Sequence, residues 1–378
     1  MNTNDLETKQ LITKSQNILI PDGDSTWALA VLQCLSAVKD YNIFVLSNTK
    51  RTATKYSKFT SYFKFFERQN DALWLDIINS EVKLHAIDVI LPIAEKEISF
   101  FIKYNHKIAK STSIIPLPEL TNFEIAIDKR KLSDFAKANG IPHPNSLFMT
   151  SEIDYQETLS KIKFPILIKP LSLKGGDGIQ KIETVEEFDN YLKKESYPIL
   201  IQEYIDGYDI DCSVLCLDGV ILNHTIQKGD LEGNNAFAPQ LAFDFLKNED
   251  VLKVAKQTMS RLNWSGIAHL DLRFDSKTND FKLIEINARF WGSVEASKFA
   301  GINFPHEIIK LTLNEEVIKK GFESIHYMRL KGVFIKVKRN PLFIFRRGYL
   351  LNNTEVKMFL KDPLPTLYKF KEWLGRRL

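Results

Sequence analysis

Cysteine is scarce in this 378-residue chain, which contains three, Cys34, Cys212 and Cys216. Their number and spacing fit neither a disulfide framework nor a zinc ribbon. Two of them lie in an apolar run that reads as a strand, so we expect reduced thiols in the protein core. This pattern favours a cytoplasmic protein.

Long hydrophobic runs are also missing. No uninterrupted apolar run approaches the roughly 20 residues that a membrane span needs, and the opening MNTNDLETKQLITKSQ has no apolar signal-peptide region. We therefore expect neither secretion nor membrane spanning. Internal repeats and low-complexity tracts are absent too. With 44% hydrophobic and 26% charged residues, the chain has room for two or three ordinary globular domains.

Charge is unevenly distributed. Residues 331–378 hold 12 Lys and Arg against 3 Asp and Glu, a net charge of +9, so the overall +4 leaves −5 for residues 1–330. This C-terminal extension also contains eight aromatic residues, and LPTLYKFKEWLGRRL predicts a short helix that brings Leu367, Phe370 and Leu374 together. Two interpretations stay open: the aromatic residues pack on the rest of the protein, or the extension makes weak peripheral contact with the inner membrane face. Nucleic acid is not expected, since no recognised reading motif accompanies the charge.

The first half of the chain alternates strands and helices. After a polar leader at 1–16, NILIPDGDSTWALAVLQCLSAV predicts a strand, a loop and a helix, and YNIFVLSN and AIDVILPIAEKEISFFIKYN predict two more strands. This alternation predicts an open parallel α/β domain for residues 17–120. Such sheets bind ligands beyond the carboxyl ends of their strands, which indicates Asp22, Gly23, Asp24, Ser25 and Glu95. Helix capping by Asp24 or Ser25 explains the loop equally well.

The next region, 121–330, predicts an α+β domain. A helix from Ile127 is stopped by Gly140, the strand FPILIKP ends at Lys169, and the glycine-rich loop SLKGGDG follows. Beyond the helix VEEFDNYLKKE, strands dominate as far as Arg289. Most of these strands are expected to be antiparallel.

Polar residues interrupt the apolar run KLIEINARF at every second place. Alternation places the polar set on one strand face and the apolar set on the other: Glu285, Asn287 and Arg289 against Ile284, Ile286 and Ala288. The preceding GIAHLDLRFD alternates in the same way, and the polar DSKTND joins the two runs as a hairpin turn. A simple register sets Asp271 opposite Glu285, with Asn287 on the same face, which suits a metal ion and a phosphate. A merely solvated face is the alternative.

Taken in chain order, these segments resemble the ATP-grasp superfamily. The resemblance rests on Lys129, Lys169, SLKGGDG, LIQEYIDG, Asp271, Glu285, Asn287 and Arg289. It covers roughly 120–310, and the preceding α/β region is similar to the domain that usually comes before the grasp module. It implies a pre-ATP-grasp-like domain followed by a two-lobed ATP-grasp domain, with a central nucleotide lobe at 160–230 and a metal-binding lobe at 231–330.

The resemblance also implies a role for each site residue. Lys129 and Lys169 would neutralise phosphate charge, beneath a flap that contains Ser172, Lys174, Gly175, Gly176 and Gly178. The segment Gln202, Glu203, Tyr204 and Ile205 would meet the adenine edge. The ribose hydroxyls would meet Asp211 or, in a second alignment, Asp209. Asp271, Glu285 and Asn287 would hold Mg²⁺, with Mn²⁺ as an alternative, and Arg289 would face the transferred phosphoryl group.

The activity that the resemblance implies is ATP-dependent ligation of a small-molecule carboxylate to an amine through an acyl phosphate. This chemistry needs no covalent nucleophile on the enzyme, and the sequence offers no convincing Ser/His/Asp or Cys/His set. His269, next to the metal strand, is better explained as a structural histidine. Two alternatives stay open: a small-molecule kinase with the same ATP residues, and an ATP-binding regulatory module.

Overall fold

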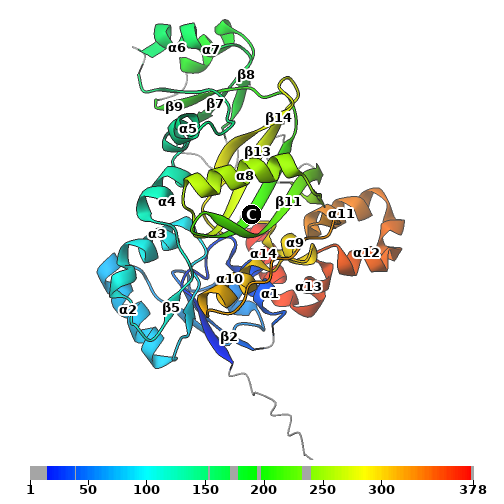
Figure 1. Cartoon of the computed structure of the whole chain (residues 1–378). Helices are drawn as coiled ribbons and strands as arrows, with labels where there is room; N and C mark the ends of the chain where they lie inside the picture. Colours follow the sequence, from blue (N-terminus) through cyan, green and yellow to red (C-terminus); the bar gives the residue numbers. More distant parts are fainter. Residues whose placement is uncertain are drawn as a thin grey trace, which may run out of the picture.

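The structure is a computed structural model that describes residues 15–38, 40–151, 154–170, 178–193, 197–231 and 240–375. Three sheets organise these residues, as Figure 1 shows. A parallel sheet lies at one end, a small antiparallel sheet at the other, and a six-stranded sheet between them. The expected combination of α/β and α+β architecture is confirmed.

The N-terminal sheet has the strand order β3-β2-β1-β4-β5 and is parallel throughout. Its strands are β1 (Gln16–Ile20), β2 (Tyr41–Ser47), β3 (Tyr62–Phe65), β4 (Val89–Ile90) and β5 (Ser113–Ile114). The helices are α1 (Ala28–Leu35), α2 (Asp71–Leu84) and α3 (Glu95–Tyr104), with short 3-10 turns η1 (Ala53–Tyr56) and η2 (Asn105–Lys107). Strand β3 and helix α2 were not anticipated from the sequence pattern. Leu19 and Val45 are fully buried, so the sheet is covered on both faces.

The loop after β1 does not cap α1, which corrects one of the two expectations for it. Helix α1 begins three residues beyond Ser25, with Trp27 at its N-cap position and no side-chain cap. Asp24 accepts instead from the Asn48 N–H (2.9 Å), and Asp22 accepts from the Ile93 and Ala94 N–H groups (3.1 and 2.8 Å). The acidic loop thus ties together the carboxyl ends of β1, β2 and β4.

Two consecutive helices lead to the small sheet. They are α4 (Leu120–Ile127) and α5 (Lys129–Ala138), and the Asp128 side chain caps α5 by accepting from the Arg130 and Lys131 N–H groups. Gly140 then adopts a positive φ of 62°, as a helix stop requires. The small sheet is antiparallel in the order β6-β9-β7-β8, with β6 (Ser146–Met149), β7 (Ile166–Pro170), β8 (Gln180–Ile182) and β9 (Ile199–Glu203). Its helices are α6 (Tyr155–Lys161) and α7 (Val185–Leu192).

The six-stranded sheet is antiparallel in the order β14-β13-β10-β11-β12-β15. Its strands are β10 (Asp209–Leu217), β11 (Val220–Leu231), β12 (Ala242–Phe245), β13 (Gly266–Asp275), β14 (Asp280–Asn287) and β15 (His326–Met328). Helices α8 (Glu249–Arg261), α9 (Val294–Phe299) and α10 (Phe304–Thr312) pack around it. One apolar core runs from this sheet into the N-terminal sheet, so the two form a continuous body.

The hairpin register of β13 and β14 matches the prediction in one respect and corrects it in another. Asp271 pairs with Glu285, as predicted, and His269 pairs with Asn287. A bulge then shifts the register, so that Leu272 pairs with Leu283 and Ile284 is the extra residue. The core residue is therefore Leu283, and the expectation that Ile284 lines the apolar face is wrong, because strict alternation assumes an unbroken ladder.

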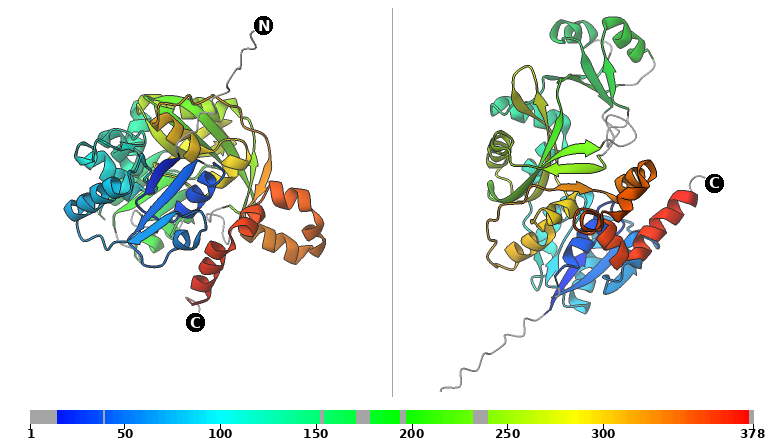
Figure 2. Two further views of the ribbon diagram at one scale, coloured as in Figure 1. Left: turned by 90° about the horizontal axis from the view of Figure 1, so that it is seen from below. Right: turned by 90° about the vertical axis from the view of Figure 1, so that its right-hand side faces the viewer.

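The chain ends in a helical region beside the N-terminal sheet (Figure 2). It comprises α11 (Leu330–Arg339), the 3-10 turn η4 (Pro341–Phe345), α12 (Arg347–Asn352), α13 (Val356–Lys361) and α14 (Pro363–Gly375). The Asp362 carboxylate accepts from Ser57 Oγ (2.5 Å) and the Lys58 N–H (3.1 Å), which fastens this region to the turn after η1. Within the described ranges, no helix is long and apolar enough to cross a membrane.

Gly207, between β9 and β10, provides a test of the fold near the site. A Cβ on this residue would lie 1.8 Å from the backbone oxygen of Phe274. We expect Gly207→Ala to destabilise the protein by about 1–3 kcal/mol, because the obstacle is backbone and cannot rotate away. Thermal unfolding measures this. Gly321→Ala is the matched control, since its Cβ would meet nothing within 4 Å, and an equal melting temperature for both variants would contradict the close approach.

Candidate active site

A pocket opens between the small sheet and the six-stranded sheet. Side chains from α5, β7, β9 and β14 line it, including Lys129, Ala136, Lys169, Gln202, Leu283 and Glu285. Ile284, which the bulge frees from the core, also faces this pocket. The pocket thus brings together residues that lie more than 150 positions apart in the chain.

Lys169 is the buried cation of this pocket. Its Nζ donates to Gln202 Oε1 at 2.6 Å, and the Gln202 amide donates in turn to Ser146 Oγ at 3.1 Å. Burial lowers the pKa of Lys169 to about 8, against the opposing influence of the Glu285 carboxylate. The partner at contact is a neutral amide, so the charge of the ammonium group remains to attract an anion.

The predicted adenine-edge segment, residues 202–205, begins at the end of β9, where Gln202 contacts Lys169. Glu203 donates its N–H to the Asn145 carbonyl (2.8 Å) and accepts from Asn145 N–H through its carboxylate (3.1 Å). The Tyr204 ring lies under the Lys181 ammonium at 4.3 Å, and the Ile205 carbonyl accepts from Arg273 Nε at 2.8 Å. Hydrogen bonds and a ring contact thus join the segment to its neighbours, and its contacts to a base stay a prediction.

The two candidate ribose residues have different surroundings. Asp209 is mostly exposed and forms an ion pair with Arg273 at 2.5 Å. Asp211 pairs across the sheet with Asp271, and its carboxylate accepts from Gln227 Nε2 at 3.1 Å. The geometry therefore groups Asp211 with the predicted metal residues. The sequence holds a signal for this grouping, because DIDCS alternates like the neighbouring strands, but the pairing of β10 with β13 could not be read from it.

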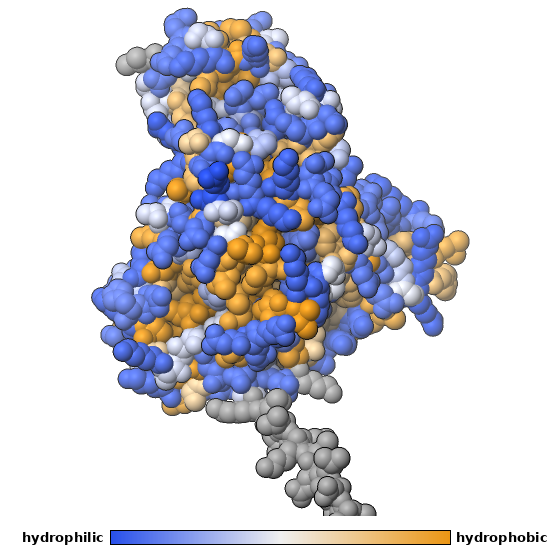
Figure 3. Space-filling model, viewed as in Figure 1, coloured by the Kyte–Doolittle hydropathy of each residue, from blue (hydrophilic) through white to orange (hydrophobic). Residues whose placement is uncertain are grey.

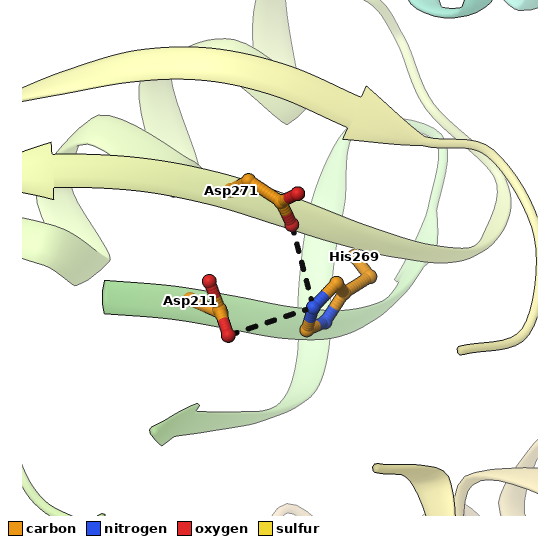
Figure 4. A group of neighbouring side chains, drawn as sticks. All are labelled: Asp211, His269 and Asp271. Atoms are coloured by element: carbon orange, nitrogen blue, oxygen red, sulfur yellow. Dashed lines mark ion pairs between the residues drawn. The ribbon is translucent and has the colours of Figure 1, made fainter. Parts of the chain in front are cut away.

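Figure 4 shows the resulting cluster of Asp211, His269 and Asp271. His269 Nε2 lies 3.4 Å from Asp271 and 3.8 Å from Asp211, and the ligand atoms of the three residues lie within 4.8 Å of one another. The other ring nitrogen hydrogen-bonds Ser213 Oγ (2.8 Å), and Trp291 stacks on the ring. Burial lowers the pKa of His269 to about 3, with Arg289 adding to the effect, so the ring is neutral at working pH.

A second row of contacts runs from the cluster to the N-terminal sheet. Asn287 Nδ2 donates toward Asp271 (3.2 Å) and Glu285 (3.4 Å), and its Oδ1 accepts from Arg289 Nη2 (2.6 Å). Arg289 also lies 3.5 Å from Glu95, the first residue of α3, and over the Trp27 ring at 5.6 Å. Glu95 thus reaches the site as the strand-end rule indicates. Trp27 was not predicted.

The carboxylates of this cluster carry more negative charge than their surroundings balance. Burial, followed by the charges of Glu285 and Asp211, raises the pKa of Asp271 well above its ordinary value. Burial also raises the pKa of Asp211 to about 7, although the Gln227 hydrogen bond opposes this. A divalent cation would relieve the repulsion, and the oxygen donors suit Mg²⁺ or Mn²⁺. The residues present therefore fit a metal ion.

The predicted flap lies outside the described residues for the most part. Ser172, Lys174, Gly175 and Gly176 are not described, whereas Gly178 is exposed and has a positive φ of 73°.

A family model described as "ATP-grasp in the biosynthetic pathway with Ter operon" matches residues 195–333. Among solved structures, N5-carboxyaminoimidazole synthetase from Staphylococcus aureus, complexed with ADP, superposes with a TM-score of 0.69. It is 14% identical and covers 87% of this chain and 86% of that one. The chain has the ATP-grasp fold. The resemblance inferred from the sequence is confirmed at the level of fold.

Two further proteins are similar to this chain, one in structure and one in sequence. L-amino acid ligase from Bacillus licheniformis is 18% identical with a TM-score of 0.57, covering 79% of this chain and 74% of that one. The large chain of carbamoyl phosphate synthase from Thermoanaerobacter sp. (strain X514) is 24% identical over 217 residues. That match covers 54% of this chain, which spans about a fifth (20%) of the length of that relative.

The carboxylate cluster gives a prediction about metal binding. Asp271→Asn should weaken Mn²⁺ binding roughly tenfold or more, because it removes a charged oxygen ligand. Titration calorimetry of the metal-free protein measures this, with Asp280→Asn at the far end of the same hairpin as the control. An unchanged Mn²⁺ affinity in Asp271→Asn would exclude this carboxylate as a ligand.

The same variant should change how stability depends on pH. A carboxyl group whose pKa is raised on folding stabilises the protein at low pH, and this contribution is lost as the pH rises through the folded-state value. The metal-free protein should therefore lose stability as the pH rises above the ordinary aspartate pKa of about 4 and through the raised pKa of Asp271, and Asp271→Asn should lose less. Thermal unfolding with a chelator present, across this range, checks the sign.

Lys169 gives a second pH dependence. A lysine with a pKa of about 8 loses its proton as the pH rises through that value, so ADP affinity without metal should fall between pH 7 and pH 9, by up to about tenfold per pH unit above 8. Lys169→Arg stays charged over this range. Its ADP affinity should be flatter, and parallel profiles for the two proteins would contradict the role of Lys169.

Proposed function

We propose that this protein is an ATP-dependent ligase that activates a small-molecule carboxylate as an acyl phosphate and couples it to an amine. ADP and phosphate are the other products. One observation carries the proposal: the buried Lys169 and the Glu285 carboxylate face the same pocket, and Glu285 pairs across the sheet with Asp271. Arg289 extends this row of side chains toward a second domain. Phosphoryl transfer needs these opposite charges, because its demands are alignment and charge stabilisation.

The nucleotide would lie in the pocket between the two sheets. Lys169 and Lys129 would meet its phosphates, with the flap residues Ser172, Lys174, Gly175, Gly176 and Gly178 covering them. Gln202, Glu203, Tyr204 and Ile205 would contact the base, and Asp209 or Asp211 the ribose. The depth of Lys169 supports this order, since a desolvated ammonium group binds phosphate more strongly than an exposed one.

Asp271, Glu285 and Asn287 would hold Mg²⁺, with Mn²⁺ as an alternative. Mg²⁺ held by these residues would supply positive charge against the negative charge that develops during transfer. Arg289 would hold the transferred phosphoryl group, since Asn287 and Glu95 orient its guanidinium from two sides. The acceptor carboxylate would then approach from the edge of the N-terminal sheet, where Asp22 ties the loops together.

The relatives favour a ligase over the two alternatives. The solved structures that superpose on this chain include proteins named as a ligase and a synthetase. A kinase on the same fold would share every ATP residue and transfer phosphate to a hydroxyl group. A regulatory module with little turnover would not need Arg289 oriented beside a complete set of metal ligands.

The proposal includes domain limits, location and partners. We assign 17–120 to the pre-ATP-grasp-like domain, 121–330 to the ATP-grasp domain and 331–378 to the C-terminal extension. The proposed compartment is the cytoplasm, which the three free, buried cysteines support. The partners are a small carboxylate and a small amine, with no nucleic acid.

The deciding experiment screens purified protein for ADP formation with amino acids and acidic metabolites, singly and in pairs, followed by mass analysis. A ligase releases ADP efficiently only when a carboxylate and an amine are both present, and the product lacks phosphate. A phosphorylated product from a single alcohol substrate would establish a kinase instead.

Two substitutions test the assigned residues. Glu285→Gln and Asn287→Ala should each lower Mg²⁺-dependent ADP formation by roughly a hundredfold or more while the protein stays folded, because both side chains lie on the ligand face and outside the core. Circular dichroism checks the fold. The matched control is Glu323→Gln, an exposed carboxylate away from the pocket, and full turnover in both site variants would refute the metal assignment.

A further inference from the structure

Apolar side chains are unusually exposed at the C-terminal end of the molecule. Residues 331–375, here called the C-terminal helical region, contain 11 of the 18 large apolar side chains that are exposed in the described part of the chain. The region is only about one eighth of the sequence. Exposure of this density marks a contact surface, because scattered single residues would spread over the whole protein.

Helix α14 shows this exposure of apolar side chains most clearly. Its inner face packs through Pro365, which is buried, and Tyr368, which stacks on Tyr56 (4.7 Å) and donates to the Arg51 carbonyl (3.0 Å). Its outer face is apolar and exposed, with Leu364, Leu367, Phe370, Trp373 and Leu374. An ordinary surface helix turns its apolar stripe toward the core. Here the stripe points away from it.

A second exposed stretch surrounds η4. Phe334 on α11 is 68% exposed, and Leu342, Ile344 and Phe345 on η4 are 70%, 56% and 72% exposed. Figure 3 shows apolar side chains at the outer end of α11 and α12, bordered by hydrophilic ones. These side chains protrude, so a rigid protein partner would need matching pockets for each.

The same region is strongly basic at its surface. Nine of its ten Lys and Arg residues are exposed, all except Lys336. Of its three acidic residues, Asp362 is buried against Ser57 and Lys58, and Glu355 accepts from the Leu330 N–H and lies 3.6 Å from Arg329. Glu372 is the one acidic side chain fully at the surface of the region. On α14, Lys371 comes four residues after Leu367 and three before Leu374, which places it next to the apolar stripe.

We propose that the C-terminal helical region docks the protein on an anionic membrane surface, with the stripe of α14 and the η4 stretch entering the interface between headgroups and acyl chains. A fluid lipid surface accepts protruding apolar side chains and supplies the negative charge that the bordering lysines and arginines need. A second copy bound through the same face would set like charges against each other. The inference goes beyond the proposed ligase activity and does not depend on it.

Vesicle flotation of the full chain tests the proposal. The protein should float with phosphatidylglycerol–phosphatidylcholine vesicles and at least tenfold less with phosphatidylcholine alone, and 0.5 M salt should reduce flotation. Leu367→Ser/Phe370→Ser and Leu342→Ser/Phe345→Ser should each lower binding by roughly tenfold. The matched control is Leu84→Ser/Val220→Ser, which removes side chains 67% and 62% exposed elsewhere on the molecule.

Two double charge-reversal variants test the electrostatic part of the binding. Lys361→Glu/Lys371→Glu should abolish binding to anionic vesicles, whereas Lys83→Glu/Lys163→Glu should leave it unchanged. All four lysines are exposed, and only Lys361 and Lys371 lie in the C-terminal helical region. Equal, negligible flotation with both vesicle types would overturn the proposal. So would a change of molar mass by light scattering in Leu367→Ser/Phe370→Ser, because a second copy would then cover the stripe. ATP turnover without vesicles is a separate readout, so either proposal can fail alone.

Discussion

The pairing of Asp271 with Glu285 across β13 and β14 is the contact on which the rest of the site depends. Two carboxylates held side by side in a sheet repel each other, and β10 adds Asp211 to the same patch. The pKa of Asp271, raised well above its ordinary value by burial and by the neighbouring carboxylates, reflects this repulsion, and a bound cation would relieve it. Asn287 and Arg289 follow Glu285 at every second position, and Arg289 reaches Glu95. The row of polar side chains therefore runs from the carboxylates toward the N-terminal sheet.

The position of β14 explains why the site includes residues from the N-terminal sheet and from the small sheet. Arg289 follows the end of β14 and contacts Glu95 and Trp27, which lie in the N-terminal α/β region. Lys169, on the small sheet, faces the same pocket as Glu285 from the other side. The six-stranded sheet therefore carries the central charges, while its two neighbours supply the surfaces between which a nucleotide and an acceptor could lie.

Much of this could be predicted from local pattern. Alternation in two adjacent runs, with a polar turn between them, is enough to set Asp271 against Glu285, because a hairpin joins strands that are neighbours in the chain. The same reasoning failed at Ile284, since a bulge depends on how the whole sheet packs. The strand-end rule indicated Glu95, but the sequence could not show its contact with Arg289, the grouping of Asp211 with Asp271, or the role of Trp27, because these contacts join strands and loops far apart in sequence. It also could not show that α14 turns its apolar face outward, because the helical pattern alone does not say which side meets the protein.

Oxygen transfer from the acceptor tests the central claim most directly. With a carboxylate that supports ADP release, labelled with ¹⁸O in both carboxyl oxygens, ligation through an acyl phosphate must leave one label in the released phosphate. The account predicts one ¹⁸O atom per phosphate, detected by mass spectrometry or by the ³¹P isotope shift, in amounts equal to the ADP formed. Released phosphate that carries no ¹⁸O, while the amide product forms in amounts equal to the ADP, would contradict it.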